Sequence, residues 1–193
     1  YDSGGKAADI QETGASPVSL EQACCQNIVI LPVPISVFGK TLKTIRPLLK
    51  ENSLVVDVCS VKAYPVAQMR EILPENISIL ATHPMFGPDS ASDSLEGRKI
   101  CLCKVRIAEK KYQNIKAYLA SKGLSVIEAT AREHDEQIAS SLSLTHFIGR
   151  TLSEYGAKPL DIDTEGYKRL LHILEVVERD TWQLFLDMNR YNP

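Results

Sequence analysis

The sequence predicts an α/β fold, in which a Rossmann-like, mostly parallel sheet is followed by an all-helical region. Short apolar runs alternate with stretches whose apolar residues recur at helical spacing. Runs that are apolar on both faces are typical of parallel strands covered on both sides by helices. No strand signal follows residue 130. We therefore divide the chain into residues 1–130, a partial Rossmann domain, and residues 131–193, a helical region.

The first part contains five apolar runs bounded by proline, glycine or polar residues, as strands commonly are. They occupy residues 27–34, 53–60, 77–83, 98–105 and 124–130. Three stretches between them predict helices, at residues 37–51, 64–75 and 109–123. Pro65 suits a first helical turn, and Gly123 suits a helix C-terminus.

The second part consists of two long helical stretches, residues 131–156 and 167–191, joined by a polar loop. About 60 residues of helix are few for an independent hydrophobic core. We expect these helices to pack on the sheet domain or on a second copy of the chain.

Composition excludes several classes of partner. The net charge of −2 over 193 residues gives no reason to expect nucleic acid or an anionic membrane. No apolar run approaches the ~20 residues of a spanning helix. The five cysteines show no CxxC spacing, which indicates reduced thiols rather than a metal site or a disulfide framework. We expect a cytoplasmic protein without a resident metal.

The beginning of the chain suggests a dinucleotide-binding unit that has been cut. In such a unit the second strand commonly ends in an acidic residue that bonds the adenosine ribose, and Asp2 fits that place. The glycine-rich turn would then lie about 20 residues earlier. We expect the sequence to be part of a longer protein.

Polar residues cluster where two neighbouring strands end. Asp57, Ser60 and Lys62 follow one predicted strand, and His83 ends the next, before a turn stiffened by proline. Carboxyl ends of parallel strands are where ligands bind in open α/β sheets. Ser60 could alternatively cap the next helix, and Lys62 is expected to be a solvated or helix-start lysine rather than a ligand.

Two more histidines, His134 and His146, lie in the first long helical stretch. Their spacing of twelve residues puts them on roughly one helix face, about 18 Å apart along the axis. One helix could thus carry both histidines into a cleft, although either could also be a structural residue.

The stretches VVDVCSVK, THPMFGPDS, EHD and LTHF together resemble the prephenate/arogenate dehydrogenase family of tyrosine biosynthesis. The resemblance runs from Asn27 to about Phe147, and the C-terminal helical stretch resembles the family's dimerisation part. It implies an intertwined, all-helical dimerisation domain after the Rossmann domain, and therefore a homodimer. It also implies NAD as cofactor, with NADP as the alternative.

The family's chemistry, carried over by this resemblance, is an oxidative decarboxylation. Hydride leaves a ring carbon of a cyclohexadiene for the nicotinamide, the hydroxyl on that carbon loses its proton, CO₂ departs and the ring becomes aromatic. The resemblance makes His83 the residue that bonds the hydroxyl, and Ser60 its contact or a nicotinamide contact. His146 matches a substrate-pocket position, and His134 matches a position that is either pocket-lining or structural. A neutral histidine suits such proton transfer near pH 7.

The remaining expected contacts concern the cofactor and the substrate carboxylates. Pro32, Val33 and Pro34 match the loop beneath the nicotinamide ribose. The nearest candidates for the carboxylate-binding arginine of many relatives are Arg169 and His172, and neither falls cleanly in place. This leaves prephenate and arogenate both open as substrates.

A carboxylate at Asp2 would favour NAD over NADP, because it repels a 2′-phosphate. Two alternatives to the dehydrogenase stay open. One is another Rossmann-type small-acid dehydrogenase, and the other is a truncated remnant without catalysis.

Overall fold

The computed structural model describes every residue except 2–6, 13, 88 and 89. Its centre is a five-stranded sheet in the order β1-β2-β3-β4-β5. The strands are β1 (Ile28–Leu31), β2 (Leu54–Asp57), β3 (Ser78–Pro84), β4 (Lys99–Arg106) and β5 (Ser125–Glu128). All neighbouring pairs are parallel except β3 and β4, which are antiparallel. The predicted mostly parallel α/β fold is therefore confirmed, with one reversal that the sequence did not indicate.

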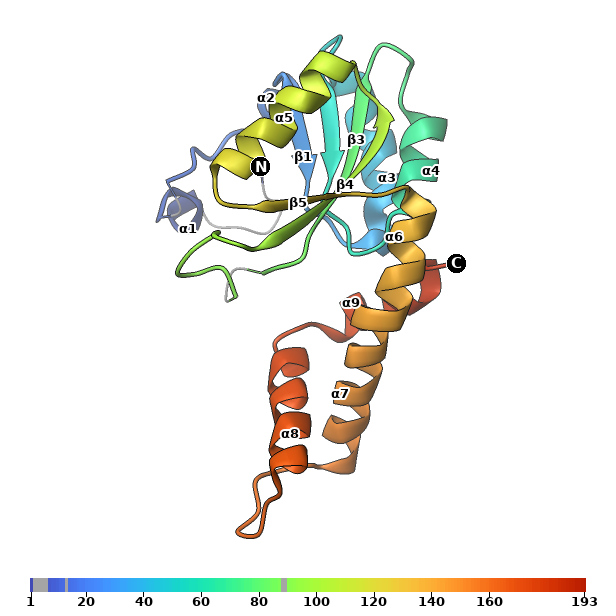
Figure 1. Ribbon diagram of the computed structural model, residues 1–193. Coiled ribbons are helices and arrows are strands. Elements are labelled where there is room, and N and C mark those ends of the chain that lie inside the picture. The colour runs from blue at the N-terminus through green and yellow to red at the C-terminus, as the bar shows by residue number, and fades with distance from the viewer. Residues whose placement is uncertain (2–6, 13, 88–89) are drawn as a thin grey trace.

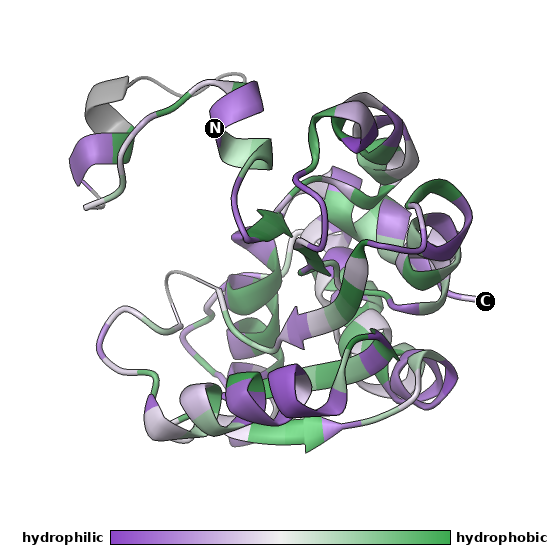
Figure 2. Cartoon of the chain, turned by 90° about the horizontal axis from the view of Figure 1, so that it is seen from above, coloured by the Kyte–Doolittle hydropathy of each residue, from purple (hydrophilic) through white to green (hydrophobic). Residues whose placement is uncertain are grey.

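Helices cover both faces of the sheet (Figure 1). The helices of this part are α1 (Ala7–Glu12), α2 (Leu20–Cys24), α3 (Ile35–Ile45), α4 (Ala63–Ile72) and α5 (Glu109–Ser121), with a 3₁₀ turn at Arg46–Leu48. Helices α3 and α4 bury their apolar stripes against one face of the sheet. Helix α5 covers the opposite face through Tyr112. Hydrophobic residues concentrate in the strands, between helices with hydrophilic outer surfaces (Figure 2).

A capping box starts the helical region. Thr130 caps α6 (Ala131–Ile138), and its hydroxyl and the carboxylate of Glu133 each accept a backbone N–H of the other. A π-helical turn, Ala139–Ser143, joins α6 to α7 (Leu144–Tyr155). Gly156 then ends α7 in the left-handed conformation, with φ of 74°.

The last two helices are α8 (Glu165–Glu178) and α9 (Trp182–Tyr191). Helices α7 and α8 form a hairpin that projects from the sheet domain, and α9 lies back against α3 (Figure 1). In the part of the chain that the structure describes, no helix is long and apolar enough to cross a membrane.

Candidate active site

A buried ion pair underlies the ends of β2 and β3. The Asp57 carboxylate at the end of β2 pairs with the Lys62 ammonium, and both side chains are 0% exposed. Asp57 also accepts the backbone N–H groups of Cys59, at 3.0 Å, and Thr82, at 3.3 Å. The Lys62 ammonium donates in addition to the Thr82 carbonyl. Lys62 thus joins the two strand ends. The expectation of a solvated lysine is wrong, whereas the alternative of a lysine at the start of the helix agrees with its position before α4.

His83 lies near the carboxyl end of β3, next to Thr82, whose backbone contacts both members of this pair, and is 5% exposed. Its Nδ1 is 2.9 Å from Nε2 of His134, and Nδ1 of His134 is 2.8 Å from Oδ1 of Asp135. Asp135 also accepts the backbone N–H groups of Lys62 and Ala63, at 2.7 Å each, where α4 begins. The first turn of α6 is therefore joined both to the rim of the sheet and to the start of α4.

Burial sets the protonation of the groups around His83. Burial is the largest cause lowering the pKa of His83 to about 3, and the nearby His134 and the Lys62 ammonium lower it further. The imidazole is neutral at physiological pH as a result. Burial also raises the pKa of the Cys59 thiol to about 12, so that Cys59 is a thiol rather than a nucleophilic thiolate.

A cleft of about 430 Å³ opens at the carboxyl ends of β1 and β2. Its walls include the predicted loop Pro32, Val33 and Pro34 and also Ser60. The opposite wall comes from the start of α9 and is formed by Thr181, Gln183, Leu184 and Asp187. Ser60 makes no hydrogen bond to His83, and α4 begins without a side-chain cap, so neither expected bond of Ser60 forms among the described residues.

His146 lies at the junction of α7 with the turn before α9. Its Nε2 is 3.3 Å from Oδ2 of Asp180, and its buried Nδ1 has no partner among the described residues. One helical turn later, Arg150 is 7% exposed and stacks on Trp182, with its guanidinium carbon 4.7 Å from the ring centre. The guanidinium donates to the Asp180 carbonyl. His146 thus belongs to a cluster separate from the His83–His134 pair.

The other predicted site residues lie elsewhere. Arg169 and His172 are exposed on α8, and His172 is 3.8 Å from Glu175 rather than in contact with His83 or His146. Asp2 lies outside the described residues. Within the described ranges, no group of three or more His, Cys, Asp or Glu residues could hold a metal ion.

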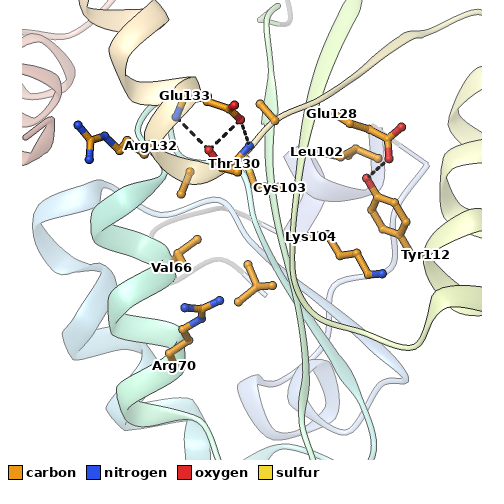
Figure 3. Close-up of a pocket in the computed structure, with 13 residues that line it drawn as sticks. Val66, Arg70, Leu102, Cys103, Lys104, Tyr112, Glu128, Thr130, Arg132 and Glu133 are labelled. Carbon is orange, nitrogen blue, oxygen red and sulfur yellow. Dashed lines mark hydrogen bonds between the residues drawn. The ribbon is translucent and has the colours of Figure 1, made fainter.

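A second cleft, of about 600 Å³, lies between β4, α4 and the start of α6 (Figure 3). It contains none of the predicted site residues. Several of its polar groups are already paired. Tyr112 donates to Glu128 at 2.7 Å, and Glu133 is engaged in the capping box with Thr130. We assign this cleft no role in the chemistry.

Three functional candidates were not predicted from the sequence: Asp135, Arg150 and Asp187. Glu133 and Asp135, on either side of His134, resemble an ordinary charged helix start, so the sequence does not indicate that Asp135 is buried. Arg150 and Asp187 are buried only because α8 and α9 fold back onto α7 and α3. The periodicity could have indicated Arg150, because it lies four residues after His146 on the same helix face.

Comparison with known proteins gives two matching families. A family described as the nucleotide-binding domain of prephenate dehydrogenase matches residues 4–128. A family described as the TYRAAT1-like C-terminal domain matches residues 151–193. Together they cover most of the sheet domain and of the helical region.

Two curated relatives come from Arabidopsis thaliana. Arogenate dehydrogenase 2, chloroplastic, is 37% identical over 150 residues, which are 75% of this chain and 42% of the relative. Arogenate dehydrogenase 1, chloroplastic, is 34% identical over 173 residues, 86% of this chain and 27% of the relative. The chain therefore spans less than half the length of either relative.

Solved structures show the same fold. Prephenate dehydrogenase from Aquifex aeolicus, in complex with hydroxyphenyl propionate and NAD+, aligns with a TM-score of 0.74 at 20% identity. The alignment covers 96% of this chain and 70% of that one. Synechocystis arogenate dehydrogenase aligns with a TM-score of 0.70 at 18% identity, over 96% of this chain and 70% of that one.

Proposed function

The chain belongs to the prephenate dehydrogenase family, and on this premise we propose that the protein oxidatively decarboxylates prephenate or arogenate with transfer of a hydride to NAD or NADP. The products would be 4-hydroxyphenylpyruvate from prephenate or tyrosine from arogenate, with CO₂. The observation that carries the proposal is the neutral, buried His83 at the sheet's rim. The names of the two Arabidopsis relatives favour arogenate as the substrate.

In this proposal His83 takes the proton of the ring hydroxyl. Its Nδ1 is engaged with His134, so Nε2 is the ring nitrogen left to accept that proton. As the C–H bond of the same carbon loses its hydride, the O–H bond breaks and an N–H bond forms on His83. Loss of CO₂ then leaves an aromatic phenolate, whose oxygen takes the proton back from His83 to give the phenol of the product. Exclusion of water around His83 strengthens its hydrogen bond to the substrate.

The cleft beside Pro32, Val33, Pro34 and Ser60 fits a nicotinamide nucleotide in position and in lining. It lies at the carboxyl ends of parallel strands, and it combines an apolar loop with one hydroxyl. These four residues would lie against the nicotinamide and its ribose. A bound nicotinamide would supply the hydride acceptor. We also propose that Asp2 selects NAD, on the sequence argument alone.

A direct assay tests the proposed function. The protein in its natural length is incubated with NAD or NADP and with prephenate or arogenate in turn, and reduced cofactor and CO₂ are measured together. Formation of both products in equal amounts from either substrate would support the proposal. Turnover of neither substrate with either cofactor would refute it.

We further propose that the protein is a homodimer joined through the helical region. The α7–α8 hairpin exposes large apolar side chains, including Phe147 at 61% and Ile162 at 93%. A change of Phe147 to Glu should convert the dimer to a monomer in light scattering.

The division of the chain after residue 130 and a cytoplasmic location stay predictions.

A further inference from the structure

Three buried side chains, those of His83, His134 and Asp135, are hydrogen-bonded in series. His83 contacts His134, and His134 contacts Asp135, through hydrogen bonds of 2.9 and 2.8 Å. All three residues are at most 5% exposed, so water does not compete for these bonds. The resemblance left open whether His134 lines the substrate pocket or is structural, and here both of its ring nitrogens contact protein groups.

The far end of this series is fixed by the fold. The Asp135 carboxylate accepts two backbone N–H groups, from Lys62 and Ala63, at 2.7 Å each. The Lys62 N–H donates to Oδ1 and the Ala63 N–H to Oδ2, so both carboxylate oxygens act as acceptors. An ionised carboxylate can only accept, so the proton of the bond to His134 must reside on Nδ1 of that ring.

Proton positions then follow along the series. A neutral His134 with its proton on Nδ1 has a lone pair on Nε2, and this nitrogen faces Nδ1 of His83. His83 must therefore donate from Nδ1, which leaves the lone pair on Nε2. The other groups around His83 do not change this order. The Lys62 ammonium can only donate and is paired with Asp57, and Cys101 lies opposite on β4.

We propose that His134 and Asp135 are positioning residues that hold His83 in the Nδ1–H tautomer, so that Nε2 can accept the proton of the ring alcohol. The inference rests on the proposed function for its chemistry, but the tautomer itself is a property of the protein alone. When His83 takes the proton, its Nδ1–H bond to His134 persists, and the carboxylate of Asp135 stabilises the positive charge through the intervening ring. Apart from the hydride that leaves the ring carbon, no other proton or electron pair moves in this step.

The test compares replacements that keep or remove the acceptor at position 134. His134→Gln retains a carbonyl oxygen that can accept from His83, whereas His134→Leu retains only bulk. We expect His134→Leu to lower kcat by roughly 10-fold or more with the KM for cofactor unchanged, and His134→Gln to recover most of that loss. Asp135→Asn should resemble His134→Leu, because an amide can donate to Nδ1 of His134 and reverse the tautomers. Gln137→Leu, on the exposed face of α6, is the matched control and should retain the wild-type rate.

Nitrogen NMR of the imidazole rings provides the readout that does not depend on activity. Wild-type His83 should show the Nδ1–H tautomer, and His134→Leu should lose that preference. An Nε2–H tautomer in the wild type, or a His134→Leu variant with wild-type kcat, would overturn the inference. If neither substrate is turned over, the proposed function fails, and the wild-type NMR spectrum still decides the tautomer even where a variant does not fold.

Discussion

His83 is the residue on which the proposed chemistry depends, and its surroundings determine what its replacement should do. Asparagine is smaller and can still hydrogen-bond to His134, but it cannot accept a proton. We expect His83→Asn to lower kcat by roughly 10²-fold or more, with little change in cofactor affinity. Steady-state kinetics and a separate measurement of cofactor binding check this. A variant that retains its rate would remove His83 from the mechanism.

The lowered pKa of His83 also predicts how stability depends on pH. The unfolded chain binds a proton at this histidine near pH 6.5, whereas the folded protein does so only near pH 3. Between these values the unfolded state holds more protons, so the free energy of unfolding falls as pH falls. The contribution of His83 approaches ~1.4 kcal/mol per pH unit. The stability that the lowered pKa of His83 contributes is fully present above about pH 6.5 and is lost as the pH falls toward 3.

Urea unfolding at several pH values between about 7 and 5 measures this slope. The carboxylates titrate mostly below that window, and the other histidines are common to wild type and His83→Asn. The difference in slope between the two proteins therefore isolates His83. Equal slopes would mean that His83 is protonated as easily in the folded protein as in the unfolded chain.

At the residue scale, sequence motifs predicted where a side chain lies in the fold better than they predicted which side chain it contacts. His83 could be singled out because a proline-rich turn follows it at the end of a strand, and the structure places it at that end. Lys62 could also be placed at a strand end, but its contact could not be predicted, because Asp57 becomes its partner only when β2 and the start of α4 fold together. For the same reason the sequence left open whether His134 is a pocket residue or a structural one, and it did not show that His134 links His83 to Asp135.

Among the elements, the helices α7 and α8 pack against each other through Gly149. A Cβ on Gly149 would lie 2.7 Å from Cβ of Val177, which is too close for ordinary packing. Gly149→Ala gains up to ~1 kcal/mol of helix propensity but forces α8 outward, and overpacking of this kind costs about 1–3 kcal/mol. We expect a net loss of stability in thermal or urea unfolding.

Gly166 in the first turn of α8 is the matched control for Gly149→Ala. A Cβ there would meet only the Thr164 hydroxyl, at 3.9 Å. Gly166→Ala should therefore be neutral or stabilising, by up to ~1 kcal/mol. If both alanine variants gain stability, α7 and α8 do not pack through Gly149.

Helices and strands could be predicted where one pattern of apolar residues continues over the whole segment. The five strands and the helices α3, α4 and α5 all overlap the predicted ranges. They could be predicted because apolar runs and apolar residues at helical spacing are local signals. The antiparallel direction of β4 carries no such signal, since direction depends on the connection between β3 and β4. The π-helical turn at Ala139–Ser143 likewise inserts within a continuous helical pattern.

At the scale of the whole molecule, the last helix returns to the first domain. Asp187 on α9 accepts the backbone N–H of Ser36 at 3.0 Å, 151 residues earlier in the chain. Pro34 precedes α3 and provides no side-chain cap, so Asp187 takes that role from a distance. Asn192 also donates to the Asp135 carbonyl at 3.0 Å. No local pattern could predict this closure, which builds one wall of the cleft beside Pro34.

Replacement of Asp187 tests whether this contact holds α9 on the sheet domain. Asp187→Ala leaves the Ser36 N–H without its acceptor and removes a negative charge from the positive end of α3. We expect a loss of about 1–2 kcal/mol in unfolding free energy. We also expect faster hydrogen exchange at α9 than in wild type, with exchange at α5 unchanged. Asp161→Ala, in the exposed α7–α8 loop, should change neither quantity. If α9 in Asp187→Ala exchanges as slowly as in wild type, apolar packing alone holds the helix, and the wall of the cleft does not depend on this distant cap.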